Sequence, residues 1–219
     1  DRRVPRHGAG ERVHDRAALA VAEDDRAAVG GDGHRHHGGR AGEDPDPLAS
    51  AQAPHLGGVG VAVEHDHRVA VAEHPDPVPG PGEVLVQLAA SGLCHSDEHL
   101  MTGDLPFELP IIGGHEGAGI VKEVGAEVSW LKPGDHVVFG FIPSCGRCPS
   151  CSTGHQNLCD LGAIIMAGTQ LDGTYRRRAR GQNIGVMALV GTFSQYGTVP
   201  EASIVKIDDD LPLSRACLL

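Results

Sequence analysis

The stretch CGRCPSC at positions 145–151, with a further cysteine at position 159, is the part of this sequence that decides the fold. Four thiols stand within fifteen residues, at spacings that let a looping backbone wrap one tetrahedral ion. These are Cys145, Cys148, Cys151 and Cys159. A zinc ion held by four sulfurs has no open coordination position, so it would stabilise local folding and take no part in a reaction. The alternative is ordinary buried or redox cysteines, but redox CxxC motifs are isolated pairs.

Short runs rich in β-branched residues lie on both sides of this cysteine lobe. They cover residues 83–91, 119–125, 135–141 and 203–208, and each is bounded by Gly, Pro or Asp. Such runs predict strands, and no amphipathic helical segment of convincing length separates them. The sequence therefore predicts a mainly β domain, a closed or partly open small barrel whose loops carry the chemistry.

The first third of the chain has a different composition. Residues 1–74 hold nine of the fourteen histidines but no Lys, Ile, Met, Cys, Phe, Tyr or Trp. Short Val/Ala alternations at 59–63 and 69–71 are strand-like, yet such small side chains bury little area. We therefore expect residues 1–76 to be a low-complexity, disordered or out-of-frame segment and residues 77–219 to form the domain. A rival interpretation is a metal-handling tail, because His34, His36 and His37 stand close together.

Charge and hydropathy exclude several classes of function. The net charge of −11 argues against a nucleic-acid or anionic-membrane partner, because phosphates would be repelled. No stretch approaches the roughly 20 apolar residues of a membrane helix, and the first thirty residues are too charged for a signal peptide. We expect a cytoplasmic protein, in which six cysteines indicate metal thiolates more than disulfides.

Two further motifs suggest a second metal site. The sequence CHSDEH at 94–99 follows the first predicted strand of the domain, and GGHEGAG at 113–119 precedes the second. The thiolate of Cys94 and the imidazole of His115 could be two ligands of a zinc whose remaining position stays open. Taken singly, Cys94 is better explained as a small buried residue and His115 as a histidine in a turn.

The motifs GLCHSD (92–97), GHEGAG (114–119) and the four-cysteine lobe resemble, in order and spacing, the zinc-dependent medium-chain alcohol dehydrogenases. The resemblance covers about residues 79–219. Residues 162–196 are similar to the nicotinoprotein, or nitrosodimethylaniline-dependent, subgroup. The resemblance implies a GroES-like, partly open β-barrel catalytic domain with a structural-zinc lobe.

By this resemblance, Cys94 and His115 are catalytic-zinc ligands. Glu116 is a transient ligand or electrostatic partner beside the metal. Asp97 orients His115, since a carboxylate that accepts the far ring N–H fixes the tautomer and raises the basicity of the imidazole.

The same resemblance assigns a proton relay and two binding residues. Ser96 takes the alcohol proton, which passes by way of a cofactor hydroxyl to His99 and then to solvent. His95 matches a contact to the cofactor pyrophosphate, and Phe141 matches an aromatic of the substrate pocket.

The implied activity is oxidation of a primary alcohol to an aldehyde by hydride transfer to a nicotinamide cofactor, NAD in the full-length parent, which we expect to be a homo-oligomer. The family's third zinc ligand, a cysteine in a Gly-Cys-Gly turn, would fall just after Leu219, and Cys217 stands four residues too early. The Rossmann domain is also absent, and the glycines at 114–119 are not a dinucleotide fingerprint. We therefore expect weak catalytic zinc binding and an inactive fragment.

Two other functions fit parts of the sequence. A non-catalytic, zinc-stabilised β-barrel acting as an interaction or assembly module would need the cysteine lobe alone. A zinc-free quinone reductase relative would need neither metal site, so zinc content separates it from the alcohol dehydrogenase reading.

Overall fold

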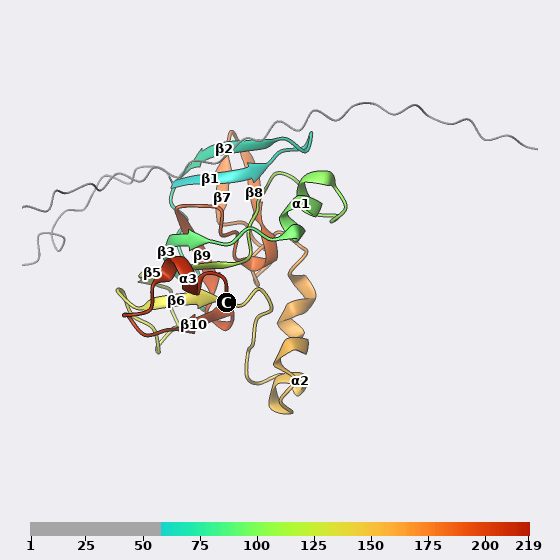
Figure 1. The fold of residues 1–219 in the computed structure, drawn as a ribbon. Helices are drawn as coiled ribbons and strands as arrows, with labels where there is room; N and C mark the ends of the chain where they lie inside the picture. The colour runs from blue at the N-terminus through green and yellow to red at the C-terminus, as the bar shows by residue number, and fades with distance from the viewer. Residues whose placement is uncertain (1–57) are drawn as a thin grey trace, which may run out of the picture. The chain divides into compact units, whose positions relative to one another are not determined.

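The computed structural model describes residues 58–219, which lie within one compact unit of residues 51–219. Within these described residues, ten strands form two five-stranded sheets, with three short helices and four 3-10 turns between them (Figure 1). This arrangement confirms the predicted mainly β architecture with few helices. The expectations for residues 1–57, the histidine-rich tail among them, lie outside the described residues.

The first sheet has the strand order β10-β6-β5-β3-β9 and supplies the main core. Strand β3 (Glu83–Ser91) pairs antiparallel with the central strand β5 (Gly117–Val124) and with the edge strand β9 (Tyr196–Pro200). The outer pair is β6 (His136–Phe139) and β10 (Ile204–Lys206). Buried apolar side chains on one face of this sheet form a single cluster, whose removal from water drives folding. Its members are Val84, Val86, Val121, Leu131, Val137, Phe139, Val190, Val199 and Ile204.

The second sheet has the order β2-β1-β4-β8-β7. It contains β1 (Gly58–Val63), β2 (Val69–His74), β4 (Ile111–Ile112), β7 (Arg177–Ala179) and β8 (Gln182–Val186). Strand β4 runs parallel to β8 and antiparallel to β1.

Strands β1 and β2 correct our expectation for residues 58–74, which we placed outside the folded domain. The two strands pair over six positions, and β1 also pairs with β4. Ala62 and Val63 are buried, whereas Val69 and Val71 are largely exposed. The hairpin thus adds to the edge of an existing sheet, so it needs little core of its own, and composition alone could not reveal that edge.

The helices are short, as expected. They are α1 (His95–Thr102), α2 (Pro149–Ser152) and α3 (Leu213–Ala216). Helix α1 ends at Gly103, whose φ of 81° lies in the left-handed region that glycine adopts without a Cβ penalty. Helix α2 begins after Cys148, inside the cysteine lobe.

Two polar side chains cap the free edge of the first sheet at β9. Gln170 donates from Nε2 to the carbonyl of Thr198 at 3.0 Å, and Arg177 donates from Nη2 to the carbonyl of Tyr196 at 2.6 Å. Both side chains are about 1% exposed. Side chains therefore satisfy carbonyls that a further strand would otherwise pair, which leaves the barrel partly open.

Candidate metal centres and catalytic groups

The sulfur atoms of the cysteine lobe converge on one point. Cys145, Cys148, Cys151 and Cys159 lie with their sulfurs within 4.8 Å of one another, and none forms a disulfide. Cys151 and Cys159 are buried and the other two are half-buried. The Sγ atoms of Cys145 and Cys151 are 4.0 Å apart. Four Zn–S bonds of about 2.3 Å in a tetrahedron separate sulfurs by about 3.8 Å, so this set fits zinc.

The local backbone prepares these sulfurs to carry negative charge. The amides of Cys148 and Cys151 donate to the sulfurs of Cys145 and Cys148 at 3.3 and 3.4 Å, and the amide of Cys145 donates to Cys159 at 3.4 Å. Backbone amides, that of Arg147 foremost, lower the pKa of Cys145 to about 6. Burial raises the pKa of Cys159 to about 11. A bound cation would remove this imbalance by stabilising all four thiolates together.

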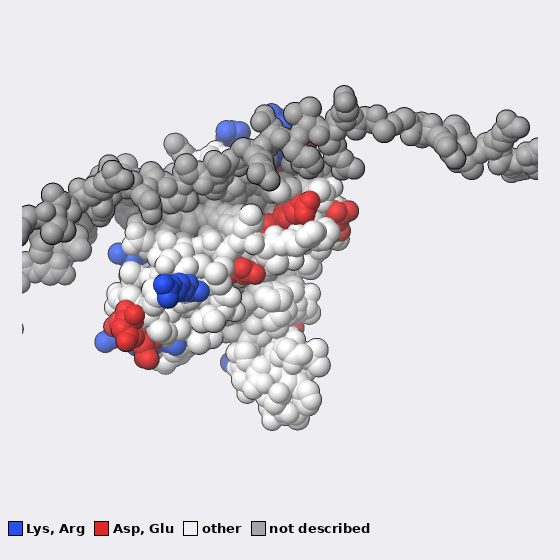
Figure 2. Space-filling view, in the orientation of Figure 1, with Lys and Arg blue, Asp and Glu red and all other residues white. Residues whose placement is uncertain are grey.

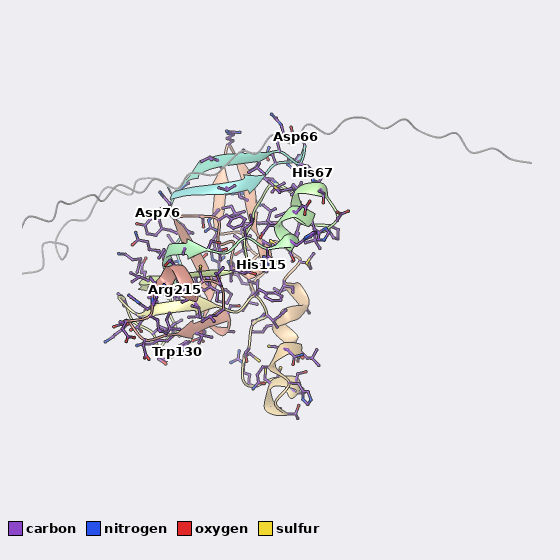
Figure 3. The ribbon with its side chains drawn as sticks, viewed as in Figure 1. Asp66, His67, Asp76, His115, Trp130 and Arg215 are labelled. Atoms are coloured by element: carbon purple, nitrogen blue, oxygen red, sulfur yellow. The ribbon has the colours of Figure 1, made fainter. Side chains whose placement is uncertain are left out.

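A second cluster joins residues from two separate segments. The ligand atoms of Cys94, His115 and Glu116 lie within 4.8 Å of one another. Cys94 directly precedes α1, and the other two stand in the turn before β5. Figure 3 shows His115 between α1 and the segment that leads to α2. A thiolate, an imidazole and a carboxylate are the chemistry of a zinc site that keeps one position open. Glu116, which the resemblance made a transient ligand or electrostatic partner, thus offers a third ligand where we expected an incomplete set.

The Asp97 carboxylate connects these two segments through the backbone. Its Oδ2 accepts the amide of Cys94 at 2.9 Å, and its Oδ1 accepts the amide of Gly114 at 3.0 Å. The imidazole Nδ1 of His115 is 3.7 Å from Oδ1, which is an ion-pair distance and too long for a hydrogen bond. Asp97 is 3% exposed. It therefore positions the backbone beside both ligands, in addition to facing the imidazole.

Charges in this cluster support one another. The Asp97 carboxylate raises the pKa of His115. The amide of Ser96, followed by the His115 ring, lowers the pKa of Cys94. Both effects favour a thiolate at Cys94, which is the form that binds metal.

Gly92 leaves room for the Glu116 carboxylate. A Cβ at position 92 would lie 2.2 Å from Glu116 Oε2, far inside van der Waals contact. Ser91 Oγ donates to the Glu116 carbonyl at 2.8 Å, and the Gly92 amide donates to it at 3.1 Å. These contacts hold Glu116 against the end of β3. The sequence analysis missed this role of Gly92, because only the pairing of β3 with β5 brings the two residues together.

The residues expected to form the relay all lie on α1. Ser96 Oγ is 3.8 Å from Cys94 Sγ. His99 Nδ1 is 3.2 Å from Asp104 Oδ2, and Asp104 also accepts from Thr102 Oγ1 at 2.7 Å. In the described part of the chain no direct hydrogen bond joins Ser96 to His99. The role of Asp104 was not expected, because no local motif indicates it.

The expected binding residues lie around the second cluster. The His95 side chain is 73% exposed. The Phe141 ring meets the His115 ring edge-on, with centroids 5.8 Å apart. Cys217 is buried beside Ala118 and Val138 and belongs to neither cysteine cluster.

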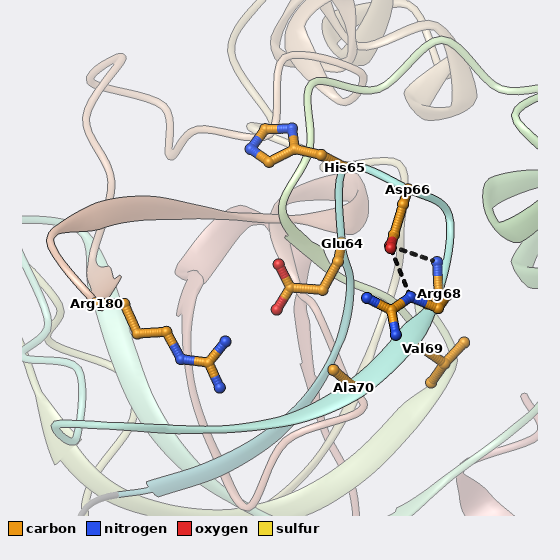
Figure 4. Close-up of a pocket in the computed structure, with 7 residues that line it drawn as sticks. All are labelled: Glu64, His65, Asp66, Arg68, Val69, Ala70 and Arg180. Atoms are coloured by element: carbon orange, nitrogen blue, oxygen red, sulfur yellow. Dashed lines mark hydrogen bonds and ion pairs between the residues drawn. The ribbon is translucent and has the colours of Figure 1, made fainter.

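Other hollows of the surface are separate from the second cluster. One cavity of about 430 Å³ lies at the β1–β2 hairpin and shares no residue with either cluster. Figure 4 shows Arg68 of this cavity bonded to Asp66. A groove of about 1060 Å³ reaches the cysteine lobe at Cys145 and is lined on another side by Trp130. None of the described helices is long and apolar enough to cross a membrane.

Comparison with known proteins identifies relatives of this chain. The family described as "Alcohol dehydrogenase GroES-like domain" matches residues 80–209. Alcohol dehydrogenase B of Mycobacterium tuberculosis is 57% identical over 139 residues, 63% of this chain and 37% of the relative. The NDMA-dependent alcohol dehydrogenase of Amycolatopsis methanolica is 52% identical over 138 residues, which are 63% of this chain and 37% of that enzyme. The chain therefore matches well under half the length of these curated relatives.

Solved structures give the same result. The alcohol dehydrogenase zinc-binding domain protein of Burkholderia ambifaria superposes with a TM-score of 0.67 at 31% identity, over 71% of this chain and 43% of that one. The benzyl alcohol dehydrogenase of Acinetobacter calcoaceticus superposes with a TM-score of 0.63 at 28% identity, over 71% and 42% of the respective chains. The GroES-like catalytic-domain fold is thus shared with zinc-binding dehydrogenases.

Proposed function

Because this chain belongs to the alcohol dehydrogenase GroES-like domain family, we propose that it is the zinc-binding catalytic domain of an enzyme that oxidises primary alcohols to aldehydes. The observation that carries the proposal is the convergence of Cys94, His115 and Glu116 at the start of the helix that bears Ser96 and His99. A structural metal lobe alone would not require this second cluster. The four cysteines of the lobe are proposed to hold a separate, structural zinc.

The residues divide the chemistry among them. Zinc held by Cys94, His115 and Glu116 would supply Lewis-acid polarisation of the alcohol, and a nicotinamide cofactor would accept the hydride. Ser96 takes the alcohol proton, and the His99 imidazole passes it to solvent. The Asp104 carboxylate holds His99 Nδ1 as a donor, which leaves Nε2 as the proton acceptor.

Other side chains orient substrate and cofactor. The exposed His95 imidazole is placed to meet a cofactor phosphate, and Phe141, beside His115, forms an apolar wall for the alcohol. We further propose NAD as the cofactor, a homo-oligomeric parent and a cytoplasmic location. The high identity to alcohol dehydrogenases supports the nicotinamide cofactor, and the six free cysteines support the reducing compartment.

Cobalt substitution tests this assignment. Cobalt(II) in the Cys94 site should give a spectrum that changes when a primary alcohol is added, because an open position accepts the alcohol oxygen. Cobalt in the lobe should give a constant tetrathiolate spectrum. Cys94→Ser should abolish the alcohol response and keep the lobe spectrum, and Cys145→Ser should do the reverse. An alcohol response that survives both Cys94→Ser and His115→Ala would overturn the proposal.

A further inference from the structure

Helix α1 presents two histidines one turn apart on its exposed side. His95 and His99 stand four residues apart, so both lie on the same helical face. Their ring centroids are 4.7 Å apart. The intervening residues make the sequence HSDEH, which has the pattern HxxEH. On a helix, two histidines at this spacing can bind one metal ion.

We infer that His95 and His99 form a third, surface metal site that takes a divalent transition-metal ion of the nickel, copper or zinc class. Two metal–nitrogen bonds of about 2.1 Å can span at most about 4.2 Å between nitrogens, which suits rings at this separation. Imidazole pairs are the ligands that these ions prefer.

Carboxylates beside the rings leave one nitrogen of each free for the ion. His95 Nε2 is 3.3 Å from Glu98 Oε2, and His99 Nδ1 is 3.2 Å from Asp104 Oδ2. A carboxylate accepts from a ring N–H, so His95 Nδ1 and His99 Nε2 keep their lone pairs. The contact of His99 with Asp104 is also the arrangement that orients metal-binding histidines in proteins.

The surroundings of the pair favour a cation. The two side chains are 73% and 46% exposed, so an ion can reach them from solvent. Acidic side chains gather over α1 on the face seen in Figure 2. Glu98 and Asp104 are both exposed. The described part of the chain has no third cluster of three ligand atoms within 4.8 Å. The ion would thus be held by two imidazoles and water.

An ion on His99 Nε2 would occupy the lone pair that the proposed proton relay uses. Metal binding at α1 and relay through His99 therefore exclude each other. This consequence rests on the proposed function, whereas metal binding itself does not.

Nickel binding tests the inference without any activity assay. Ni²⁺ is titrated by equilibrium dialysis into the zinc-replete full chain that carries His34→Gln, His36→Gln and His37→Gln, which removes the histidine cluster near the N-terminus. We expect one bound Ni²⁺ per chain, with at least tenfold weaker binding after either His95→Gln or His99→Gln. His155→Gln, which changes an exposed histidine of the cysteine lobe, is the matched control. It should bind Ni²⁺ as tightly as the chain that carries only the three N-terminal substitutions.

Two further measurements separate this site from the others. Cys94→Ser should keep the Ni²⁺, because the α1 site does not use the thiolate. The copper-loaded chain should show two coordinated nitrogens by electron paramagnetic resonance, and one after His99→Gln. Unchanged Ni²⁺ affinity in His95→Gln and His99→Gln, or loss of Ni²⁺ in Cys94→Ser alone, would overturn the inference.

Discussion

Replacing the buried Arg177 with methionine should stabilise the protein. Arg177 is 1% exposed, and its Nε and Nη1 have no hydrogen-bond partner. Burial, with no carboxylate to compensate it, lowers the pKa of the guanidinium to about 10. The folded-state pKa of this cation is depressed, so the penalty is fully present at neutral pH, begins to fall only as the pH rises above about 10, and is gone only above the ordinary pKa of arginine. It corresponds to about 3 kcal/mol.

Methionine would remove that penalty at a smaller cost. The Arg177 hydrogen bonds to the Tyr196 carbonyl and to Ser194 Oγ would both be lost, which together costs about 1.5–3 kcal/mol for a charged donor. Ser194 Oγ still donates to the same carbonyl at 2.9 Å, so the acceptor is not left bare. We therefore expect a net gain of up to about 1.5 kcal/mol, or up to roughly 6 °C in Tm for a chain of this size.

Thermal unfolding of the zinc-saturated protein, followed by calorimetry at neutral pH, measures this gain. Arg178→Met is the matched control, because Arg178 is exposed on the same strand and bonds only to Asn183. Its free energy of unfolding should change by no more than about 0.5 kcal/mol, the usual range for a surface substitution. A lower Tm for Arg177→Met than for Arg178→Met would show that the guanidinium is net stabilising, and would refute the reasoning.

Three other predictions concern the site and the stability of the domain. Asp97→Ala should lower the free energy of unfolding in urea by about 3 kcal/mol, because two buried amides lose a charged acceptor; Asp97→Asn, which keeps one carbonyl oxygen, should lose less, and equal losses would contradict this. Gly92→Ala should displace the Glu116 carboxylate and thereby change the cobalt spectrum of the Cys94 site. Gly146→Ala is the control: there is open space around its Cβ position, and any strain it causes lies in the cysteine lobe, so the spectrum of the Cys94 site should not change. Arg176 lowers the pKa of Asp172 to about 2, so this contact stabilises the folded state above the ordinary Asp pKa of 3.8, and the stabilisation is lost as the pH falls toward 2. Because Asp172 is half-exposed, Asp172→Asn should remove less than about 1 kcal/mol of the stability that is lost in acid, measured by unfolding at a series of pH values. An unchanged dependence of stability on pH in this range would argue against the ion pair.

The two metal clusters differ in how far the sequence could predict them. The four lobe cysteines are close in the chain, so their spacing alone predicts convergence, and their sulfurs do lie within 4.8 Å. Cys94 and His115 are far apart in the chain. They meet because Ser91 at the end of β3 pairs with Gly117 at the start of β5, which places the following and preceding loops side by side. Without the family resemblance, neither residue could be assigned to a site.

Strand patterns were informative where side chains are large and branched. The run predicted over 83–91 is strand β3, residue for residue. The Val/Ala-rich segment 58–74 has few large side chains, so its composition predicts no folded structure. It nevertheless forms β1 and β2, because β1 can pair with strand β4. That partner is supplied by the tertiary structure, so no count of apolar residues within the segment could include it.

The sequence by itself determined the family, the mainly β fold and the cysteine lobe. These features depend on the spacing of nearby residues and on strand patterns that can be recognised within short segments of the chain. Tertiary structure decided which polar groups are buried. Three consecutive arginines at 176–178 look alike in sequence, yet Arg176 is clamped by Glu83, Arg177 is enclosed between the sheets and Arg178 faces solvent. Burial and charge pairing arise between segments distant in sequence, and they set the electrostatics of Asp97 and Arg177.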